Sequence, residues 1–368
     1  MNVILLDPFE VTLPQDITAS LTCDYHINVL KFNRRGTQLA TGSQEGTICI
    51  WDMDTLGISM ELKGHVQPIT SLSFSRCGKF LLSSSRDWNV ILWDLKSKSR
   101  MDTIRFTSAV QLAIIHPRKN SFIVLAHMDS PCLFVQEESQ DMDWKKVILE
   151  TPEPRKDTPT TIQYHPSGKY ILVGTNKGFL LTFTEHGEYI KEQRISSSSI
   201  KQIQFNTSGR EVLINSLDRI IRVFGVKDTT LQNEQKFLDA IDRMQWSKCH
   251  FSADGEYIAA STMSFIKMLE GPQEGMSDMT WHPTRPLIAS VSNYYGHVNL
   301  WQHIPTQKFS SFEPLFTELD DNIEYIEEED EYDIKERVIE KKNVYEEADV
   351  DIVQDDLVKL MSDTDDED

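Results

Sequence analysis

The 368-residue sequence lacks most of the features that mark membrane, secreted or metal-binding proteins. No apolar run approaches the roughly 20 residues that a transmembrane helix needs. The start, MNVILLDPFE, has no basic residues before its apolar run, so it does not resemble a secretory signal. The five cysteines are odd in number, widely spaced and without a C-x-x-C pair. A disulfide scaffold or zinc ribbon is therefore not expected, and we expect a soluble protein in a reducing, intracellular compartment.

Signatures of catalysis are also missing from the sequence. It contains no phosphate loop G-x-x-x-x-G-K-[ST], no H-E-x-x-H, no G-x-G-x-x-G and no G-x-S-x-G. We therefore expect no enzyme activity, no cofactor and no metal site. His116, His165 and His282 each precede a proline at the same place in a repeat. Recurrence at a fixed repeat position favours a structural role over a shared metal ion.

The charge is distributed very unevenly along the chain. The net charge is −20, from 57 acidic and 37 basic residues. Residues 313–368 hold 24 of the acids and 5 of the bases, which leaves 33 acids and 32 bases in residues 1–312. The sequence thus predicts a nearly neutral body, 1–312, and an acidic tail, 313–368, that attracts basic partners.

The body repeats one pattern seven times. Gly36 and Gly78 are 42 residues apart, and so are Trp51 and Trp93. Each copy has a polar turn, an apolar run, a second turn and an alternating run that often ends in an aromatic residue, which is strand periodicity. Copies of this length, with four short strands, are typical of WD-type propeller blades. We predict an all-β, seven-bladed WD-repeat β-propeller with a largely extended tail. The weaker copies begin at His116, His165, Phe205, Phe251 and His282.

The second copy, GHVQPITSLSFSRCGKFLLSSSRDWNVILWD, resembles a complete repeat of the WD-repeat family. The resemblance implies that His65, Ser83, Asp87 and Trp93 form a hydrogen-bonded structural tetrad. The same Ser, His and Asp could be taken for a hydrolase triad, but the exposed nucleophile elbow is absent. The first copy departs from the pattern, because Glu45 stands at the position of the turn aspartate.

Two features concern how the ring is completed. The last copy lacks an outer strand after Trp301, and we expect the apolar Asn2–Leu6 segment to supply it, because this would remove an exposed sheet edge. The sixth copy is short: Thr262 to Gly271 spans 9 residues, whereas Ser43 to Gly64 spans 21 in the first copy. Either this blade is truncated or the sequence lacks an internal segment near Ala260 to Phe265. The second interpretation is favoured, because losing a middle strand leaves the outer strand unpaired.

Basic residues near the fifth and sixth copies could contact phosphate. Arg219 and Arg222 flank two isoleucines in an expected second-to-third-strand turn, and Arg243 and Lys248 flank Trp246. Turns of successive blades share one rim, so these residues could form a local positive patch. Independent, solvated turns are the favoured interpretation for each residue alone.

The tail is acidic but punctuated by apolar residues, which indicates linear motifs that become ordered on binding. The segments LFTELDDNIEYIEEEDEYDI and EEADVDIV, after a WD propeller, resemble the retinoblastoma-binding protein five family and its fungal counterparts. These are the propeller subunits of COMPASS and MLL histone-three lysine-four methyltransferase complexes.

The resemblance implies three tail motifs and a nucleosome contact. One motif meets the catalytic SET domain, one the Ash-type SPRY-domain subunit, and one a second WD-repeat subunit; Ala348 departs from the animal pattern in the third. Arg219 and Arg243 match positions that touch the nucleosome. The motif residues are Phe316, Leu319, Asp320, Asn322, Ile323 and Glu324 for SET; Glu327, Glu328, Glu329, Asp330, Glu331, Tyr332, Asp333 and Ile334 for SPRY; and Asp349, Val350, Asp351, Ile352 and Val353 for the WD subunit.

The resulting hypothesis is a nuclear, non-catalytic scaffold that activates a histone-three lysine-four methyltransferase, with partners that include the nucleosome but no membrane. Two other functions fit the same residues. A general WD-repeat adaptor, for example of a ubiquitin ligase, would use the tail only as a solubiliser. A histone-binding protein would use the tail as a polyanion. Ser362 and Thr364 each precede an acid by three positions, which suits acidophilic kinases.

Overall fold

The structure is a computed structural model, and it describes residues 14, 16–119, 122–127, 132–137, 144–149, 157–227, 229–238, 245–262, 276–292 and 296–302. Every regular element in these ranges is a β-strand, so the all-β prediction is confirmed. In this part of the chain no helix has the length and apolar character required to cross a bilayer.

The strands form seven antiparallel sheets, six with four strands and one with two in the described ranges. We number the sheets 1 to 7 along the chain. Sheet 1 is β2 (Ile27–Phe32), β3 (Gln38–Ser43), β4 (Thr47–Asp52) and β5 (Gly57–Lys63); sheet 2 is β6 (Ile69–Phe74), β7 (Phe80–Ser85), β8 (Asn89–Asp94) and β9 (Ser99–Arg105); sheet 3 is β10 (Val110–Ile115), β11 (Phe122–His127), β12 (Leu133–Glu137) and β13 (Trp144–Ile148). Sheet 4 is β14 (Pro159–Tyr164), β15 (Tyr170–Thr175), β16 (Phe179–Thr184) and β17 (Tyr189–Arg194); sheet 5 is β18 (Ile200–Phe205), β19 (Glu211–Ser216), β20 (Ile221–Lys227) and β21 (Thr230–Phe237); sheet 6 is β22 (Trp246–Phe251) and β23 (Ile258–Thr262); sheet 7 is β24 (Met276–Trp281), β25 (Leu287–Ser292), β26 (Val298–Gln302) and β1 (Asp16–Leu21).

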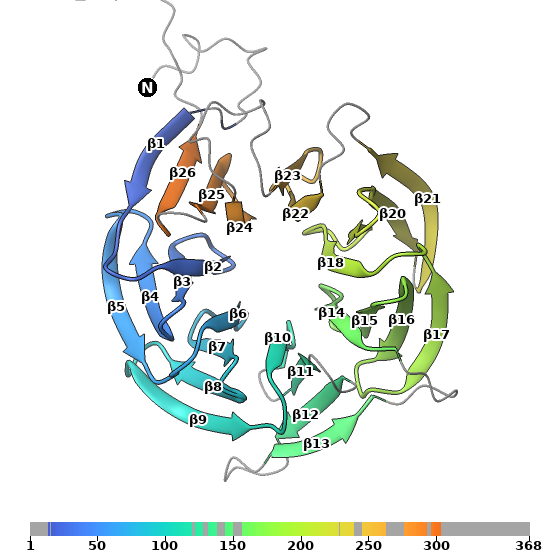
Figure 1. Cartoon of the computed structure of the whole chain (residues 1–368), viewed down its shortest axis with the longest axis horizontal. Helices are drawn as coiled ribbons and strands as arrows, with labels where there is room; N and C mark the ends of the chain where they lie inside the picture. The colour runs from blue at the N-terminus through green and yellow to red at the C-terminus, as the bar shows by residue number, and fades with distance from the viewer. Residues whose placement is uncertain are drawn as a thin grey trace, which may run out of the picture. The chain divides into compact units, whose positions relative to one another are not determined.

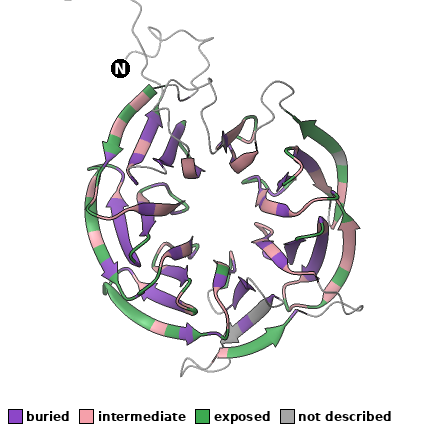
Figure 2. Ribbon diagram, in the orientation of Figure 1, coloured by how far each residue is buried: buried purple, intermediate pink, exposed green. Residues whose placement is uncertain are grey.

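The sheets stand around a common centre like the blades of a propeller (Figure 1). The innermost strands are β2, β6, β10, β14, β18, β22 and β24, and each contacts the next, with β24 returning to β2. The middle strands are buried on both faces, as in FLLSSS of β7, because neighbouring sheets cover them. The outer strands, such as SRMDTIR of β9, are largely exposed (Figure 2). The core is therefore a series of apolar interfaces between adjacent sheets.

The outer strand of sheet 7 comes from the N-terminal side of the chain, but from a different segment than expected. β1 (Asp16–Leu21) pairs with β26, with Asp16 opposite Gln302 and Leu21 opposite Val298. Asn2–Leu6 lies outside the described residues, and the prediction that it fills this position is wrong. The reason is that only alternate side chains of this outer strand are buried or partly buried. The alternating segment DITASL therefore fits the position better than a continuous apolar run does.

Sheet 6 reflects the short sixth repeat. Thirteen residues, 263–275, separate β23 from β24, whereas twenty-five, 44–68, separate β3 from β6. The residues 263–265 at this join lie outside the described ranges.

One hydrogen bond recurs between inner strands of neighbouring sheets. The side chain at the third position of an inner strand accepts from the backbone N–H at the fourth position of the next. Ser71 accepts from Ala113 at 2.9 Å, and Asp278 accepts from Leu30 at 2.9 Å. Gln202 both accepts from the Cys249 N–H at 3.0 Å and donates to its carbonyl at 2.9 Å. These bonds satisfy backbone groups that no strand ladder reaches.

The recurring H-P turns form a second contact between sheets. We call the turn that joins the first and second strands of a sheet its first turn. The His116 Nε2 atom bonds the carbonyl of Gly168 in the next first turn at 3.0 Å. His165 bonds Gly209, and His282 bonds Gly36 across the junction of sheets 7 and 1, both at 3.0 Å. The sequence already held this signal for two of the three, since His116 and His165 are each followed about one repeat later by a turn glycine.

The glycine partner is required for close approach as well as for backbone conformation. A Cβ atom on Gly36, whose φ is +76°, would lie 2.1 Å from the His282 ring. Gly78, in the first turn of sheet 2, has a similar φ of +71° but nothing within 4 Å. Replacing each glycine by alanine and comparing the losses of stability therefore separates the energy of the contact between sheets from the cost of a positive φ.

We predict that Gly36→Ala destabilises the propeller more than Gly78→Ala does. Both variants place an L-residue at positive φ, which costs about 1–2 kcal/mol. Gly36→Ala also forces the His282 ring away from its partner, which adds about 1–3 kcal/mol. Urea unfolding followed by tryptophan fluorescence measures both values. Equal losses would show that the junction between sheets 7 and 1 tolerates displacement of His282.

The turn histidines are held neutral in one tautomer. The Nδ1 atom of His116 accepts from the backbone N–H groups of Arg118 and Lys119, so its Nε2 atom carries the proton donated to Gly168. The Nδ1 atom of His282 likewise accepts from Arg285. Burial lowers the pKa of His116, His165 and His282, because a charged imidazole loses its hydration there.

We predict that stability falls as the pH drops from 7.5 to 5.5. The pKa of each turn histidine is lower in the folded state, so only the unfolded state takes up protons just below the ordinary value of about 6.5. The stabilisation is complete above that value and is lost progressively below it. Urea midpoints at the two pH values measure the change.

His165→Asn provides the matched variant for this prediction. Asn206 occupies the equivalent turn position in sheet 5, beside Gly255, and cannot titrate. The variant should therefore lose part of the drop between pH 7.5 and 5.5. A wild-type midpoint that stays constant or rises on acidification would contradict the assignment.

Candidate functional site

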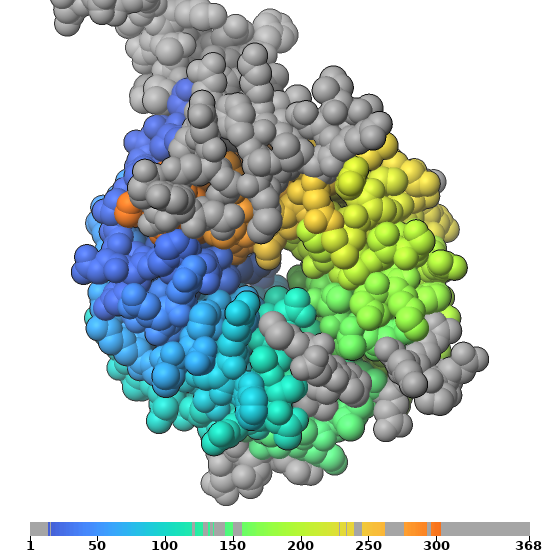
Figure 3. Space-filling view, viewed as in Figure 1, coloured from blue at the N-terminus to red at the C-terminus, as the bar shows by residue number. Residues whose placement is uncertain are grey.

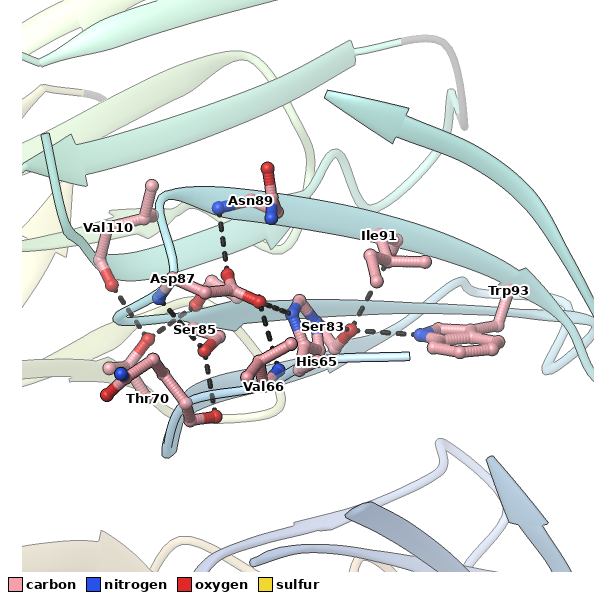
Figure 4. Close-up of polar contacts among 12 residues, drawn as sticks. His65, Val66, Thr70, Ser83, Ser85, Asp87, Asn89, Ile91, Trp93 and Val110 are labelled. Atoms are coloured by element: carbon pink, nitrogen blue, oxygen red, sulfur yellow. Dashed lines mark hydrogen bonds and ion pairs between the residues drawn. The ribbon is translucent and has the colours of Figure 1, made fainter. Parts of the chain in front are cut away.

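The second sheet brings together all four residues of the expected tetrad (Figure 4). His65 precedes β6, Ser83 lies in β7, Asp87 in the turn after it, and Trp93 in β8. The His65 Nδ1 atom lies 2.9 Å from Asp87 Oδ2, and its Nε2 atom 2.8 Å from Ser83 Oγ. The Trp93 indole N–H donates to Ser83 Oγ at 2.9 Å. This series of hydrogen bonds thus runs from Asp87, near the propeller surface, to Trp93 in the core.

The protonation states of His65 and Asp87 determine which atom donates in each of these hydrogen bonds. Burial lowers the pKa of His65, even though the Asp87 hydrogen bond opposes this, so the imidazole is neutral. Burial alone would raise the pKa of Asp87, but bonds from His65 and from the Asn89 and Val66 N–H groups outweigh it and leave the pKa lowered. His65 therefore donates from Nδ1 to the carboxylate, and Ser83 donates to Nε2.

This arrangement has the connectivity of a hydrolase triad but not its chemistry. Ser83 has no exposed surface, and His65 is 7% exposed. The Ser83 oxygen also accepts the Trp93 N–H, so one of the two lone pairs that a nucleophile would use is occupied. A substrate carbonyl cannot reach the hydroxyl without unfolding the sheet. The four residues fasten the loop before β6 to the inside of sheet 2.

Other sheets keep only the inner part of this network. The Trp51 indole donates to Thr41 at 3.1 Å in sheet 1, and that of Trp301 donates to Ser290 at 2.8 Å in sheet 7. Glu45, at the turn position that Asp87 holds in sheet 2, is exposed. Sheet 1 therefore offers an internal control for the histidine and aspartate of sheet 2.

We predict that Asp87→Ala destabilises the propeller by about 1–3 kcal/mol, because it removes the acceptor of the buried His65 N–H. Glu45→Ala, at the same turn position in sheet 1, should change stability by less than about 0.5 kcal/mol. Urea unfolding of both variants compares them. A negligible effect of Asp87→Ala would mean that water replaces the carboxylate.

The expected positive patch around sheet 5 is only partly present. Arg222 lies within β20 rather than in a turn, is 6% exposed, and pairs with Asp218 at 2.6 Å and Glu234 at 3.2 Å. Lys248 lies on the inner strand β22 and pairs with Asp278 at 3.6 Å. Including these two residues in a patch was wrong, because carboxylates from neighbouring strands neutralise them.

Arg219 lies in the turn before β20, as expected, with a φ of +68°. Its carbonyl accepts the Trp246 indole N–H at 3.1 Å. Arg243 lies outside the described residues, and so do all candidate residues of the tail, 313–368. In the part of the chain that the structure describes, no group of three His, Cys, Asp or Glu residues is placed to hold a metal ion.

The ring of antiparallel sheets, six of them four-stranded in the described ranges, and the tetrad define a WD-repeat β-propeller. The family model "WD domain, G-beta repeat" matches residues 17–52, which hold most of β1 and all of β2 to β4, and residues 57–94, which hold β5 to β8. The crystal structure of the Myceliophteria thermophila Cps50 (Swd1) β-propeller domain has a TM-score of 0.74 and 34% sequence identity. The matched region covers 79% of this chain and 100% of the crystallised chain.

Curated relatives place the chain more narrowly. It is 36% identical to "Set1 complex component swd1" of Schizosaccharomyces pombe, over 91% of this chain and 90% of that protein. It is 33% identical to the Drosophila melanogaster "Retinoblastoma-binding protein 5 homolog" (91% and 72%). Identity to "COMPASS component SWD1" of Saccharomyces cerevisiae is 30% (95% and 91%). The chain belongs to the Swd1/retinoblastoma-binding protein 5 family, as its tail motifs suggested.

Proposed function

We propose that this protein is a non-catalytic, nuclear subunit of a COMPASS-type complex that methylates lysine 4 of histone H3. The observation that carries the proposal is the 36% identity, over 91% of the chain, to a protein named as a Set1 complex component. Similarity to a COMPASS component over 95% of the chain supports it. The buried serine of the tetrad supports a structural rather than hydrolytic role.

The propeller itself is best described as seven blades, with the two-stranded sheet 6 as the sixth. The seven sheets and the closed cycle of inner strands support this count. In this proposal the blades supply a rigid platform, and the acidic segment 313–368 supplies the binding motifs.

The tail is proposed to bridge three partners. Leu319 and Ile323 lie among the residues proposed to meet the SET domain, and Tyr332 and Ile334 in the acidic box proposed for the SPRY-domain subunit. Val350 and Val353 would occupy apolar pockets of a second WD-repeat subunit. Carboxylates meeting a basic groove would give orientation and fast association, while the apolar side chains would give affinity. Several weak motifs on one chain gain strength through effective concentration.

The experiment is a reconstituted methyltransferase core assembled with the full-length chain or with Tyr332→Ala combined with Ile334→Ala. We predict that methyl transfer to a histone H3 peptide falls at least tenfold for the double variant, because its apolar anchors are lost while the charge is unchanged. A matched control is Val338→Ala with Ile339→Ala, in the mixed-charge stretch between the motifs.

The outcomes separate the proposal from its alternatives. Full activity of the Tyr332/Ile334 variant would favour a general WD-repeat adaptor with a solubilising tail. Binding to free histones that depends only on tail charge, and disappears at moderate salt, would favour a histone-binding role. Equal losses in both double variants would show that the whole segment, rather than the acidic box, is needed.

A further inference from the structure

The first turns of the sheets lie together on one face of the propeller. Strands alternate in direction within each sheet, so first turns share one end of the strands and the turns between second and third strands share the other. The bonds from His116 to Gly168, His165 to Gly209 and His282 to Gly36 connect successive first turns directly. We call this surface the first-turn face; it surrounds one mouth of the central opening of the ring, an opening that Figure 3 shows.

The first-turn face is strongly basic. Its described first turns carry nine Lys and Arg residues against two acids, Asp254 and Glu256, both in sheet 6. The described turns between third and fourth strands lie at the same end and add Lys96 and Lys98 together with three acids, Asp54, Glu185 and Glu188. The described turns between second and third strands, on the opposite face, carry three bases and three acids. The nine basic residues, all exposed, are Arg34, Arg35, Arg76, Lys79, Arg118, Lys119, Lys169, Arg210 and Arg285.

Most of this charge is not neutralised within the described part of the chain. Lys119 pairs with Glu185 at 3.4 Å, and Arg285 with Asp54 at 3.5 Å. The other seven have no carboxylate within 4.0 Å there. These seven charges form no ion pair in the described ranges, and like charges gathered on one face repel one another.

The charge is densest over three neighbouring sheets. Sheets 1, 2 and 3 each place two cations in their first turn, next to β2, β6 and β10, which are neighbours in Figure 1. We call these six residues the basic arc: Arg34, Arg35, Arg76, Lys79, Arg118 and Lys119. Four of the six are arginines, whose planar guanidinium can bond two phosphate oxygens at once.

We propose that the first-turn face, through the basic arc, binds the phosphate backbone of duplex DNA. An extended series of cations matches a ligand whose phosphates repeat regularly, about 3.4 Å apart along each strand, better than it matches a single anion. A membrane surface is a poorer match, because none of the large apolar residues that the structure shows as exposed lies in the three arc turns. Peripheral membrane binding normally inserts such residues.

This surface is distinct from the one that holds Arg219, and it does not depend on the proposed function. Arg219 lies in a turn between second and third strands, at the opposite end of the strands from the basic arc. The arc also lies entirely within the propeller, so it involves none of the tail motifs. The two ideas can therefore fail separately.

The first test measures binding of the full-length protein to a fluorescent 20-base-pair duplex by anisotropy between 25 and 150 mM salt. Low salt is used because the contacts between cations and phosphates weaken steeply as the salt concentration rises. If the arc neutralises six phosphates, the logarithm of affinity should fall against the logarithm of salt with a slope of about −5. A slope near zero would overturn the proposal.

A matched pair in sheet 2 localises the effect. Arg76 lies in the first turn and Arg86 in the second-to-third-strand turn, both exposed and without a carboxylate partner in the described ranges. Arg76→Gln should reduce the slope by about 0.9, whereas Arg86→Gln should leave it unchanged. Combining Arg34→Gln, Arg76→Gln and Arg118→Gln should weaken binding at 50 mM salt at least tenfold, with the urea midpoint unchanged.

Cys77 provides a reporter within the arc. It lies between Arg76 and Lys79 and is exposed, whereas Cys23 is half-buried and Cys49, Cys132 and Cys249 are buried. Saturating duplex should slow maleimide labelling of Cys77 at least fivefold and leave Cys23 unchanged, as read by peptide mass spectrometry.

Three outcomes would overturn the proposal. Equal losses from Arg76→Gln and Arg86→Gln would show a diffuse charge effect. Unchanged labelling of Cys77 at saturating duplex would place the DNA elsewhere. Binding to anionic vesicles without binding to duplex would assign the face to a lipid surface instead. In each case methyl transfer to a histone H3 peptide, measured in the reconstituted core, reports on the proposed function separately.

Discussion

The fold depends on closing a ring with hydrogen bonds alone. Each inner strand is bonded to the next, and the last sheet is completed by β1, a strand from the opposite end of the chain. The chain connects every sheet to the next, because β1 of sheet 7 runs on into β2 of sheet 1, and the ring is closed without a covalent link inside sheet 7, where β1 pairs with β26. At the junction between sheets 7 and 1, the His282–Gly36 contact and the Asp278 bond to Leu30 add to the strand pairing. The surfaces described above keep their geometry only while this junction is intact.

Much of this architecture could be predicted from the sequence because a structural repeat leaves a regular spacing of similar residues. The 42-residue spacing of Trp51 and Trp93 gave the sheet period, and the tetrad followed from the types and positions of its four residues. The closing strand was misassigned, because apolar content is a poor guide to an outer strand that is largely solvated. What fits that position is an alternating segment: the side chains of β1 are exposed and partly buried in turn up to the buried Leu21.

Charge was harder to interpret than apolar pattern. Arg222 looked free in the sequence, yet Glu234, twelve residues later in β21, pairs with it across the sheet. The basic arc was not recognised, although every first turn was identified, because its residues are far apart in sequence and become neighbours only when sheets stand side by side. To predict a patch that forms across several sheets, one must know the order of the sheets around the ring and which turns share a face. No single repeat contains that information.

The pairing of β1 with β26 also determines how the molecule responds to mechanical force. Asp16 and Gln302 lie opposite each other at one end of an antiparallel pair. A force that pulls the chain segments flanking these two residues apart therefore acts on the pair from one end and opens it rung by rung, like a zipper. Antiparallel strands loaded in this way resist much less than strands pulled lengthwise past each other, because each hydrogen bond carries the force in turn. Tension between the two ends of the propeller would thus open sheet 7 first and leave sheets 1 to 5 intact.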